Sequence, residues 1–362
     1  MGHRRSVWAI AALAWIQAVP ASAYTIQTGL TAGCHEKMTA EAFVAFLDDP
    51  AWAELVVPES DTWRKLARPL NRWLLDEALI QEELRDPELF VLFSLVVGVR
   101  APDTNGLSTT DLATQRAIHA SPLPDAQYVH ALRAPRDDEP EGSQTAATGT
   151  RALIGRSFFA AIDAWGQPSD AQIYMAPVTL DFYDSFQVEV WRPAFLLGEA
   201  AHALQDSFAH SIRSEASDFR TIVHVLNYVD AIYKEFDESR DGVAHSRHLD
   251  RCDETDVVGL KEAGDLAVED LLAAFLQSRS GDTATLDDLL EEWMTLEEGC
   301  SVENDFCDNA PALATARKDA TGPILPKWMT CSAENPAPSG TWGSVAAVFF
   351  MLALSTRLSG RR

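Results

Sequence analysis

The chain has 362 residues, of which 47% are hydrophobic and 23% charged, and its formal net charge is −25 at pH 7. This length and apolar content are sufficient for one large or two ordinary folded domains with a full core, which excludes a disordered chain. The excess of carboxylates repels phosphate backbones and anionic membranes at long range, so it disfavours broad nucleic-acid binding, whereas the same negative field concentrates divalent cations.

The first 23 residues have the pattern of a secretory signal peptide. Arg4 and Arg5 form a basic start, an apolar run of about ten residues follows, and the tripeptide ASA at 21–23 matches an A-x-A cleavage site. The sequence therefore predicts export, with a mature chain that begins at Tyr24. The expected location is the cell envelope, at the periplasm or the surface, or the medium outside the cell.

Export into an oxidising compartment makes the five cysteines disulfide candidates before they are metal thiolates. Cys300 and Cys307 border a short acidic loop and are predicted to pair. Spacing selects no partner for Cys34, Cys252 or Cys331, and one cysteine is left over because the number is odd.

Between the two ends, apolar residues recur at three- and four-residue spacing, which predicts helices. The predicted helical segments lie near residues 38–48, 61–98, 150–165, 190–213, 217–239, 257–278 and 283–296. Strand-like alternation is scarce, and two long connections, 100–149 and 297–328, separate the helical segments. Connections of this length in a compact domain are usually functional or disordered. We therefore expect an all-α fold, with a single multi-helix domain over residues 24–330 and long connecting loops.

The C-terminal end has a Pro/Ser-rich linker at 331–341, an apolar stretch from Trp342 to Leu354 and a basic end. The apolar stretch is about 13 residues long, which is short for a transmembrane helix of about 20 residues. This pattern resembles bacterial C-terminal sorting tails, which retain a protein at the envelope. We expect residues 342–362 to act as a sorting signal or anchor; the alternative is a C-terminal helix packed on the domain.

The segment GEAAHALQDSFAH at 198–210 places His202, Asp206 and His210 at four-residue spacing. On a helix these side chains share an arc of about 80°, into which Glu199 also falls. An ordinary amphipathic helix with a solvated polar stripe is the alternative interpretation. Solvated stripes are usually built from Lys, Glu, Arg and Gln, whereas two imidazoles and a carboxylate are ligands for first-row metal ions.

Other candidate residues have ordinary explanations when each is considered by itself. His35 lies at the start of a helix in HEKMT, which is not the H-E-x-x-H motif of zinc proteases because position 39 is Thr. Asp103 lies in a Pro-Asp-x-Asn-Gly turn, His130 in the helical segment AQYVHALR, and His224 in the apolar segment TIVHVLNYVDA. Their order along the chain changes this interpretation.

That order resembles the zinc-dependent phospholipase C superfamily, which also includes the single-strand-specific zinc nucleases of fungi and plants. The specific part is GEAAHALQDSFAH, which is similar to the family's Gly-x3-His-x3-Asp-x5-His segment, and the weaker parts extend the resemblance over residues 35–230. The resemblance implies a helical fold of the zinc phospholipase C type with two or three zinc ions. It also implies that the amine and carbonyl of Tyr24 bind zinc after cleavage. The other implied ligands are His35, Asp103, His130, His202, Asp206, His210 and His224.

The chain departs from the family pattern at two places. In the family an acid lies four residues after the last helical histidine, whereas Tyr228 lies four residues after His224. The interval from Asp206 to His210 is also shorter than the family's interval. One zinc site could therefore be altered or vacant. The residues that could supply the missing ligand are Asp230, His245, His248 and Asp250.

The chemistry that the resemblance implies is hydrolysis of a phosphodiester by a metal-activated water. Asp103 would orient this water or act as the general base. We therefore expect an exported zinc-dependent phosphodiesterase with phospholipid headgroups as substrates. A zinc nuclease of the same superfamily is one alternative, which the net charge disfavours. A non-catalytic helical envelope protein that retains the fold is the other.

Overall fold

The computed structural model describes residues 33–47, 57–58, 84–108, 117–179, 185–233, 236–246, 248–252, 254, 257–278 and 284–318. The chain divides into two units, Met1–Ile324 and Leu325–Arg362, and all described residues belong to the first. The predicted signal peptide at 1–23, Tyr24, Cys331, the linker and the tail at 342–362 lie outside the described residues. Within the described part, no helix has both the length and the apolar character needed to cross a bilayer.

The predicted all-α fold is confirmed in part: the described residues are mainly helical, but they also form two small antiparallel sheets. The longer helices are α2 (Cys34–Phe46), α5 (Asp86–Thr104), α8 (Gly142–Trp165), α9 (Arg192–Ala209), α12 (Val258–Ser278) and α13 (Ala284–Trp293). The shorter helices are α7 (Pro124–Tyr128), α10 (Val229–Tyr233), α11 (Glu238–Asp241), α14 (Asp305–Asp308) and α15 (Ala310–Ala316). Single 3-10 turns lie at η1 (Ser169–Gln172), η2 (Glu215–Ser217) and η3 (Val302–Asn304).

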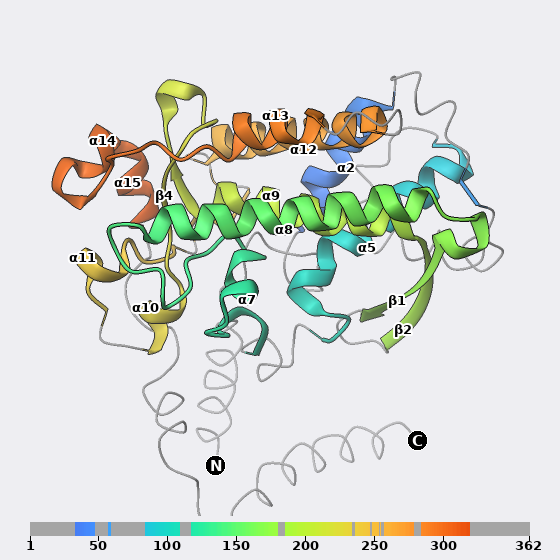
Figure 1. Cartoon of the computed structure of the whole chain (residues 1–362), viewed down its shortest axis with the longest axis horizontal. Coiled ribbons are helices and arrows are strands. Elements are labelled where there is room, and N and C mark those ends of the chain that lie inside the picture. The colour runs from blue at the N-terminus through green and yellow to red at the C-terminus, as the bar shows by residue number, and fades with distance from the viewer. Residues whose placement is uncertain are drawn as a thin grey trace, which may run out of the picture. The chain divides into compact units, whose positions relative to one another are not determined.

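Helix α9 is the centre of the fold and packs against α5, α8, α12 and α2 (Figure 1). It begins after Trp191 with a proline in its first turn, where the missing N–H removes no helical hydrogen bond. Its surface is rich in alanine, so neighbouring helices can approach from several sides. Helices α5 and α9 touch at Gly98 and Gly198, because a Cβ on Gly198 would lie 2.3 Å from the carbonyl oxygen of Leu95. The glycine that opens the GEAAHALQDSFAH segment therefore permits this close crossing.

Two antiparallel pairs of strands accompany the helices. The hairpin of β1 (Ile173–Thr179) and β2 (Ser185–Trp191) pairs Ile173 with Trp191 and Thr179 with Ser185. The short strands β3 (Ser211–Arg213) and β4 (Ile222–Val225) form the second pair, with an irregularity in the register after Ile212.

The second pair corrects two predictions. The helix predicted at 190–213 ends at Ala209, and the segment predicted as one helix at 217–239 contains β4, α10 and α11. The β-branched residues of β4 favour an extended backbone once β3 offers its hydrogen-bonding groups. Apolar spacing within 217–239 alone does not reveal this partner. The long connection at 100–149 holds α7 and the start of α8, and the described part of 297–328 holds η3, α14 and α15.

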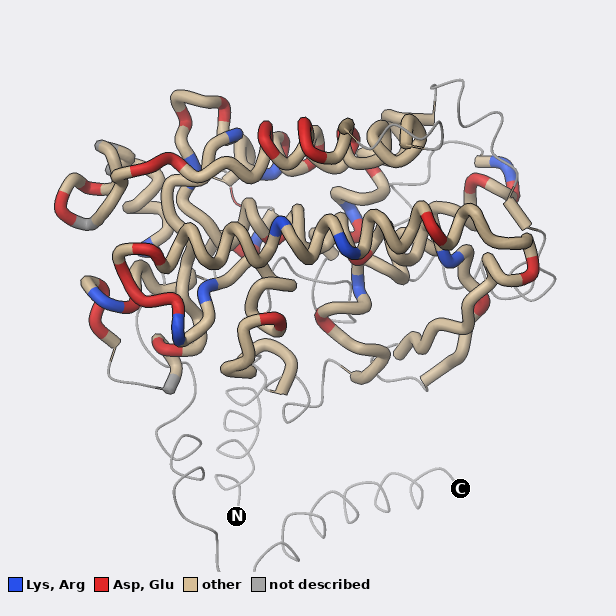
Figure 2. Tube along the Cα trace, in the orientation of Figure 1, with Lys and Arg blue, Asp and Glu red and all other residues tan. Residues whose placement is uncertain are grey.

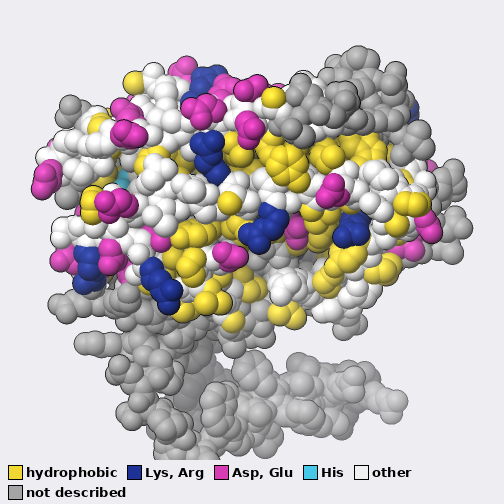
Figure 3. Space-filling view, viewed as in Figure 1, with side chains coloured by type: hydrophobic (Ala, Val, Ile, Leu, Met, Phe, Trp, Pro, Cys, Tyr) yellow, Lys and Arg dark blue, Asp and Glu magenta, His cyan; other side chains and the backbone are white. Residues whose placement is uncertain are grey.

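A large apolar core surrounds α9, and a smaller one lies around β3, β4 and α15. The predicted Cys300–Cys307 disulfide is confirmed, and a second disulfide joins Cys34 to Cys252. Acidic residues, coloured red on the tube in Figure 2, are prominent on α13. The face shown in Figure 3 exposes apolar side chains but almost no histidine, since most of the described histidines are buried.

Candidate metal centre

Three groups of buried His and Asp side chains could each hold a metal ion, since the ligand atoms of each group lie within 4.8 Å of one another. The first group is His35, His202 and Asp206; the second is Asp103, His119 and His130; the third is His210, His245 and Asp250. The first two groups adjoin and are called the central cluster, and the third is called the outer group. A further set, Glu297 with Cys300 and Cys307, is excluded because its sulfur atoms form a disulfide.

Helix α9 supplies His202 and Asp206 from adjacent turns, with 3.0 Å between His202 Nε2 and Asp206 Oδ2. Asp103 lies in the last turn of α5, which continues through Pro102 and ends at Asn105 in a left-handed conformation. The Asp103 carboxylate lies 3.9 Å from His202 Nε2 and 3.6 Å from His130 Nδ1. The close crossing of α5 and α9 therefore brings these ligands together.

Hydrogen bonds to the protein orient three of the imidazoles. His202 Nδ1–H donates to the carbonyl of Val99 at 2.9 Å, and His210 Nδ1–H donates to the carbonyl of His130. His35 Nδ1–H donates to Gln205 Oε1 at 2.6 Å, and Gln205 Nε2 in turn donates to Thr39 Oγ1 at 2.9 Å. In each ring Nδ1–H donates to an acceptor of the protein, so Nε2 is the nitrogen that faces the carboxylates. Metal-binding histidines are held in this way.

Asp206 lies between the imidazoles of the central cluster. Its Oδ1 lies 3.2 Å from His35 Nε2, and its Oδ2 lies 3.2 Å from His130 Nδ1. Burial would raise the pKa of Asp206, but His202, His210 and His35 outweigh burial and hold the pKa well below its ordinary value. Burial would likewise lower the pKa of His35, but Asp206 and Asp103 outweigh it and raise the pKa to about 9. The central cluster around Asp206 thus strongly favours a positive charge.

The outer group lies where α9 ends. His210 follows the last helical residue, and its Nε2 is 3.5 Å from Asp250 Oδ1, while His245 Nε2 is 2.9 Å from the same oxygen. Burial would raise the pKa of Asp250, but His245 and His210 lower it. Asp250 therefore carries a negative charge between two imidazoles.

Several buried ligand atoms make no hydrogen bond to any described residue. Among them are His130 Nε2 in the central cluster and His210 Nε2 and Asp250 Oδ2 in the outer group. Buried polar atoms without a partner are uncommon and costly in folded proteins. Ions bound to both sets of ligands would satisfy them.

Among the described residues, neither His224 nor Asp230 belongs to one of the three groups of candidate ligands. His224 Nε2 accepts the backbone N–H of Val243 at 3.1 Å, and its Nδ1 lies 3.0 Å from Ser143 Oγ, so both ring nitrogens are engaged. Burial, with the nearby Arg133, holds the pKa of His224 well below its ordinary value. The Asp230 carboxylate accepts a hydrogen bond from the Asn227 amide.

Of the alternatives to these two residues, His245 and Asp250 complete the outer group, whereas His248 belongs to none of the three groups. No sequence pattern predicts His119 as a metal ligand. It lies in the long connection after Asp103, where no helical spacing relates it to another ligand. Only the path of the chain brings its Nε2 to 3.8 Å from Asp103 Oδ1.

A cavity of about 520 Å³ borders the central cluster at His130. Its walls are mainly apolar and come from α5, α8, α9 and β1; they include Ala101, Pro102, Leu153, Tyr174, Phe195 and Ala203. The rings of Tyr174 and Phe195 lie 5.3 Å apart. Two charged residues also line the cavity: Arg156, which lies 3.8 Å from Asp125, and Glu199. Burial raises the pKa of the Glu199 carboxyl to about 7.

Comparison of the chain with protein-family models, with curated proteins and with solved structures finds no match. The mainly helical fold and the two disulfides are features that many unrelated proteins share. The buried His and Asp groups and the adjoining cavity are therefore the features from which a function can be inferred.

Proposed function

We propose that the protein is an exported zinc-dependent phosphodiesterase with a fold of the zinc phospholipase C type, and that phospholipid headgroups are its substrates. Residues 342–362 would retain it at the cell envelope. The observation that supports the proposal most strongly is the placement of three His/Asp groups around the end of α9, with a cavity beside them. Two carboxylates and four imidazoles in the central cluster are far more than a structural core requires.

The donor set favours zinc among the common metals. Imidazole nitrogens and single carboxylate oxygens are usual zinc ligands, whereas calcium and magnesium prefer oxygen alone. The cysteines in the described part of the chain are all in disulfides, so no thiolate competes there. His35, His202 and Asp206 would hold one ion, Asp103, His119 and His130 a second, and the outer group a third.

Bound zinc would supply a water of lowered pKa and positive charge to stabilise the phosphoryl oxygens. The chain's own residues prepare this chemistry. Asp103 lies 3.7 Å from His35 Nε2 and 3.6 Å from His130 Nδ1, where its carboxylate can orient a water and accept its proton. Val99 and Gln205 keep His202 and His35 in the orientation that ligation requires.

The cavity favours a lipid-type substrate over a nucleic acid. Its walls are mainly apolar, and above its raised pKa of about 7 the ionised Glu199 would repel a second phosphate of a polynucleotide backbone. Arg156 does not offset this fully, because it lies near the carboxylate of Asp125. A substrate with a single phosphodiester and an apolar or cationic substituent fits this lining better than a polynucleotide does.

The test uses the full exported protein loaded with zinc. We expect release of the phosphorylated headgroup from phosphatidylcholine vesicles, little cleavage of single-stranded DNA, and loss of hydrolysis in Asp103→Asn. Cleavage of DNA alone would overturn the lipid assignment in favour of the nuclease. Zinc content separates an enzyme from a non-catalytic envelope protein: two or three ions per chain support the proposal, and none or one contradicts it.

A further inference from the structure

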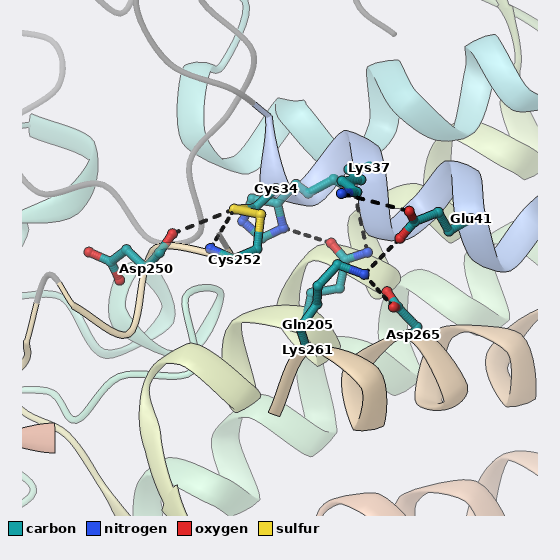
Figure 4. The surroundings of a disulfide bond; sticks show 9 residues. Cys34, Lys37, Glu41, Gln205, Asp250, Cys252, Lys261 and Asp265 are labelled. Carbon is teal, nitrogen blue, oxygen red and sulfur yellow. Dashed lines mark hydrogen bonds and ion pairs between the residues drawn. A yellow bond between two sulfur atoms is a disulfide. The ribbon is translucent and has the colours of Figure 1, made fainter. Parts of the chain in front are cut away.

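The Cys34–Cys252 disulfide joins the two parts of the metal centre. Cys34 directly precedes His35 of the central cluster, and Cys252 lies two residues after Asp250 of the outer group. The bond spans a sequence separation of 218 residues, with 5.8 Å between the Cα atoms. Figure 4 shows it between the first turn of α2 and the segment that carries Asp250.

Local contacts hold the bond against this segment. The backbone N–H of Cys252 points to Cys34 Sγ at 3.0 Å, and the same sulfur lies 3.7 Å from the carbonyl oxygen of Asp250. The Cys34 side chain is buried, with 2% of the residue exposed. The position of the Asp250 backbone thus depends directly on the disulfide.

The two sides of the disulfide are anchored very differently. Helix α2 has other attachments: Glu36 pairs with the buried Arg100 of α5, Glu41 pairs with Lys261 of α12, and His35 bonds to Gln205 of α9. Figure 4 shows the pair of Glu41 and Lys261 beside the disulfide.

The segment at 248–252 has turns but no helix or strand. Its backbone hydrogen bonds at Leu249 and Arg251 are local and long, at 3.2 Å and 3.4 Å. Besides the disulfide, the described structure attaches this segment through the burial of Leu249, the ion pairs of Asp250, a hydrogen bond from the His248 backbone N–H to Ser246 Oγ and a local ion pair of Arg251 with Glu254. Among these attachments, the disulfide is the covalent link between the Asp250 segment and α2, so its loss should loosen Asp250 and leave His35 in place.

We propose that the Cys34–Cys252 disulfide is a positioning element for the outer metal ion: it holds Asp250 against His210 and His245, so that this ion binds tightly only when the disulfide is formed. The inference rests on metal binding in the proposed function, but it does not require phosphodiesterase activity. The central cluster keeps its ions when the disulfide is absent, because α9, α5 and the attachments of α2 hold its ligands.

The test compares zinc binding by the full chain in three forms: unchanged, Cys34→Ser/Cys252→Ser, and Cys300→Ser/Cys307→Ser as a matched control that lacks the other disulfide. We expect the first variant to bind one zinc ion about 10- to 100-fold more weakly and the other ions normally, since outer-shell supports have effects of this size. The control should bind like the unchanged protein. Asp250→Asn should weaken the same ion, and combining it with Cys34→Ser/Cys252→Ser should add little, because both changes act on one ligand.

If the serine variant does not fold, the folded zinc-loaded protein is reduced instead. Tris(2-carboxyethyl)phosphine, which has no thiol to compete for zinc, reduces the disulfide to two thiols and becomes the phosphine oxide, with the oxygen and the two protons supplied by water; iodoacetamide then alkylates the thiols. Release of one zinc equivalent to a chromogenic chelator supports the proposal. Full retention of zinc, or release of all ions together, overturns it. An unchanged protein that binds no zinc contradicts the proposed function itself, which is a different result.

Discussion

His202 Nε2 lies 3.0 Å from Asp206 Oδ2, and both side chains are fully buried on consecutive turns of α9. An isolated pair of this kind in a core would be costly, because a buried charge needs compensation. Here Asp206 also faces His35 and His130, so one carboxylate serves three imidazoles. The predictions below start from this arrangement.

Asp206→Asn should remove zinc from the central cluster. The amide keeps the shape of the side chain but lacks the charge that draws a cation between the imidazoles. We expect the loss of at least one ion per chain by elemental analysis, with most of the helical circular dichroism retained. Asp230→Asn is the control, since Asp230 is equally buried but bonded to Asn227. Unchanged zinc content in Asp206→Asn would rule out a role for this carboxylate in binding metal.

Gln205→Ala should weaken zinc binding without removing a ligand. Gln205 accepts the Nδ1–H of His35 and so fixes the direction of Nε2. Losing such a support typically lowers metal affinity about 10- to 100-fold. The measurement is a competition titration with a chelator, and Gln144→Ala on the exposed side of α8 is the control. Equal affinities of the two variants would contradict this prediction.

His245→Asn and His224→Asn should have opposite outcomes. His245 faces Asp250 in the outer group, whereas both ring nitrogens of His224 are engaged within the protein. We expect His245→Asn to lose one zinc ion. His224→Asn should keep all its zinc and lose about 1–3 kcal/mol of unfolding free energy, because buried partners are left unsatisfied. Zinc loss in His224→Asn alone would restore His224 as a ligand.

Glu199→Gln should stabilise the protein at neutral and higher pH. Burial raises the pKa of Glu199 from an ordinary value of 4.5 to about 7. Below pH 4.5 the carboxyl is protonated in both the folded and the unfolded chain and has no effect on stability through ionisation. Between pH 4.5 and 7 only the unfolded chain ionises, so the free energy of unfolding falls as pH rises and the loss is complete above pH 7. Glu199→Gln avoids this loss of unfolding free energy, which is about 3–4 kcal/mol for the shift from 4.5 to about 7 at about 1.4 kcal/mol per pH unit.

Denaturant unfolding at pH 4.5 and pH 8 measures this difference. Glu262→Gln, on the exposed surface of α12, controls for the removal of one negative charge. A gain for Glu199→Gln that is the same at both pH values would contradict the assigned cause. A buried carboxyl that lowers the stability of the protein is often kept because it has a role in binding. The expected gain in stability on replacing Glu199 therefore supports a role for this residue in the cavity.

The sequence alone was sufficient for features that depend on local spacing. The helical character of the chain, the Cys300–Cys307 disulfide across seven residues and the common face of His202 and Asp206 all follow from residues close together in the chain. Helical geometry determines which side chains share a face before any tertiary contact forms. The resemblance to a known family added His35, Asp103 and His130, and the structure brings these into one cluster with the pair on α9.

Only the tertiary structure decided the rest of the centre. His245 and Asp250 lie in segments without helix or strand, and His119 lies in a short helical stretch of the long connection. The folded chain brings all three beside ligands that are far away in sequence. Strand β4 likewise needs β3 as its partner, which apolar spacing within one segment does not reveal. Contacts between residues far apart in sequence depend on how the helices pack and on the path of the loops. Only the folded structure therefore shows that His245 is a candidate metal ligand and that His224 is not.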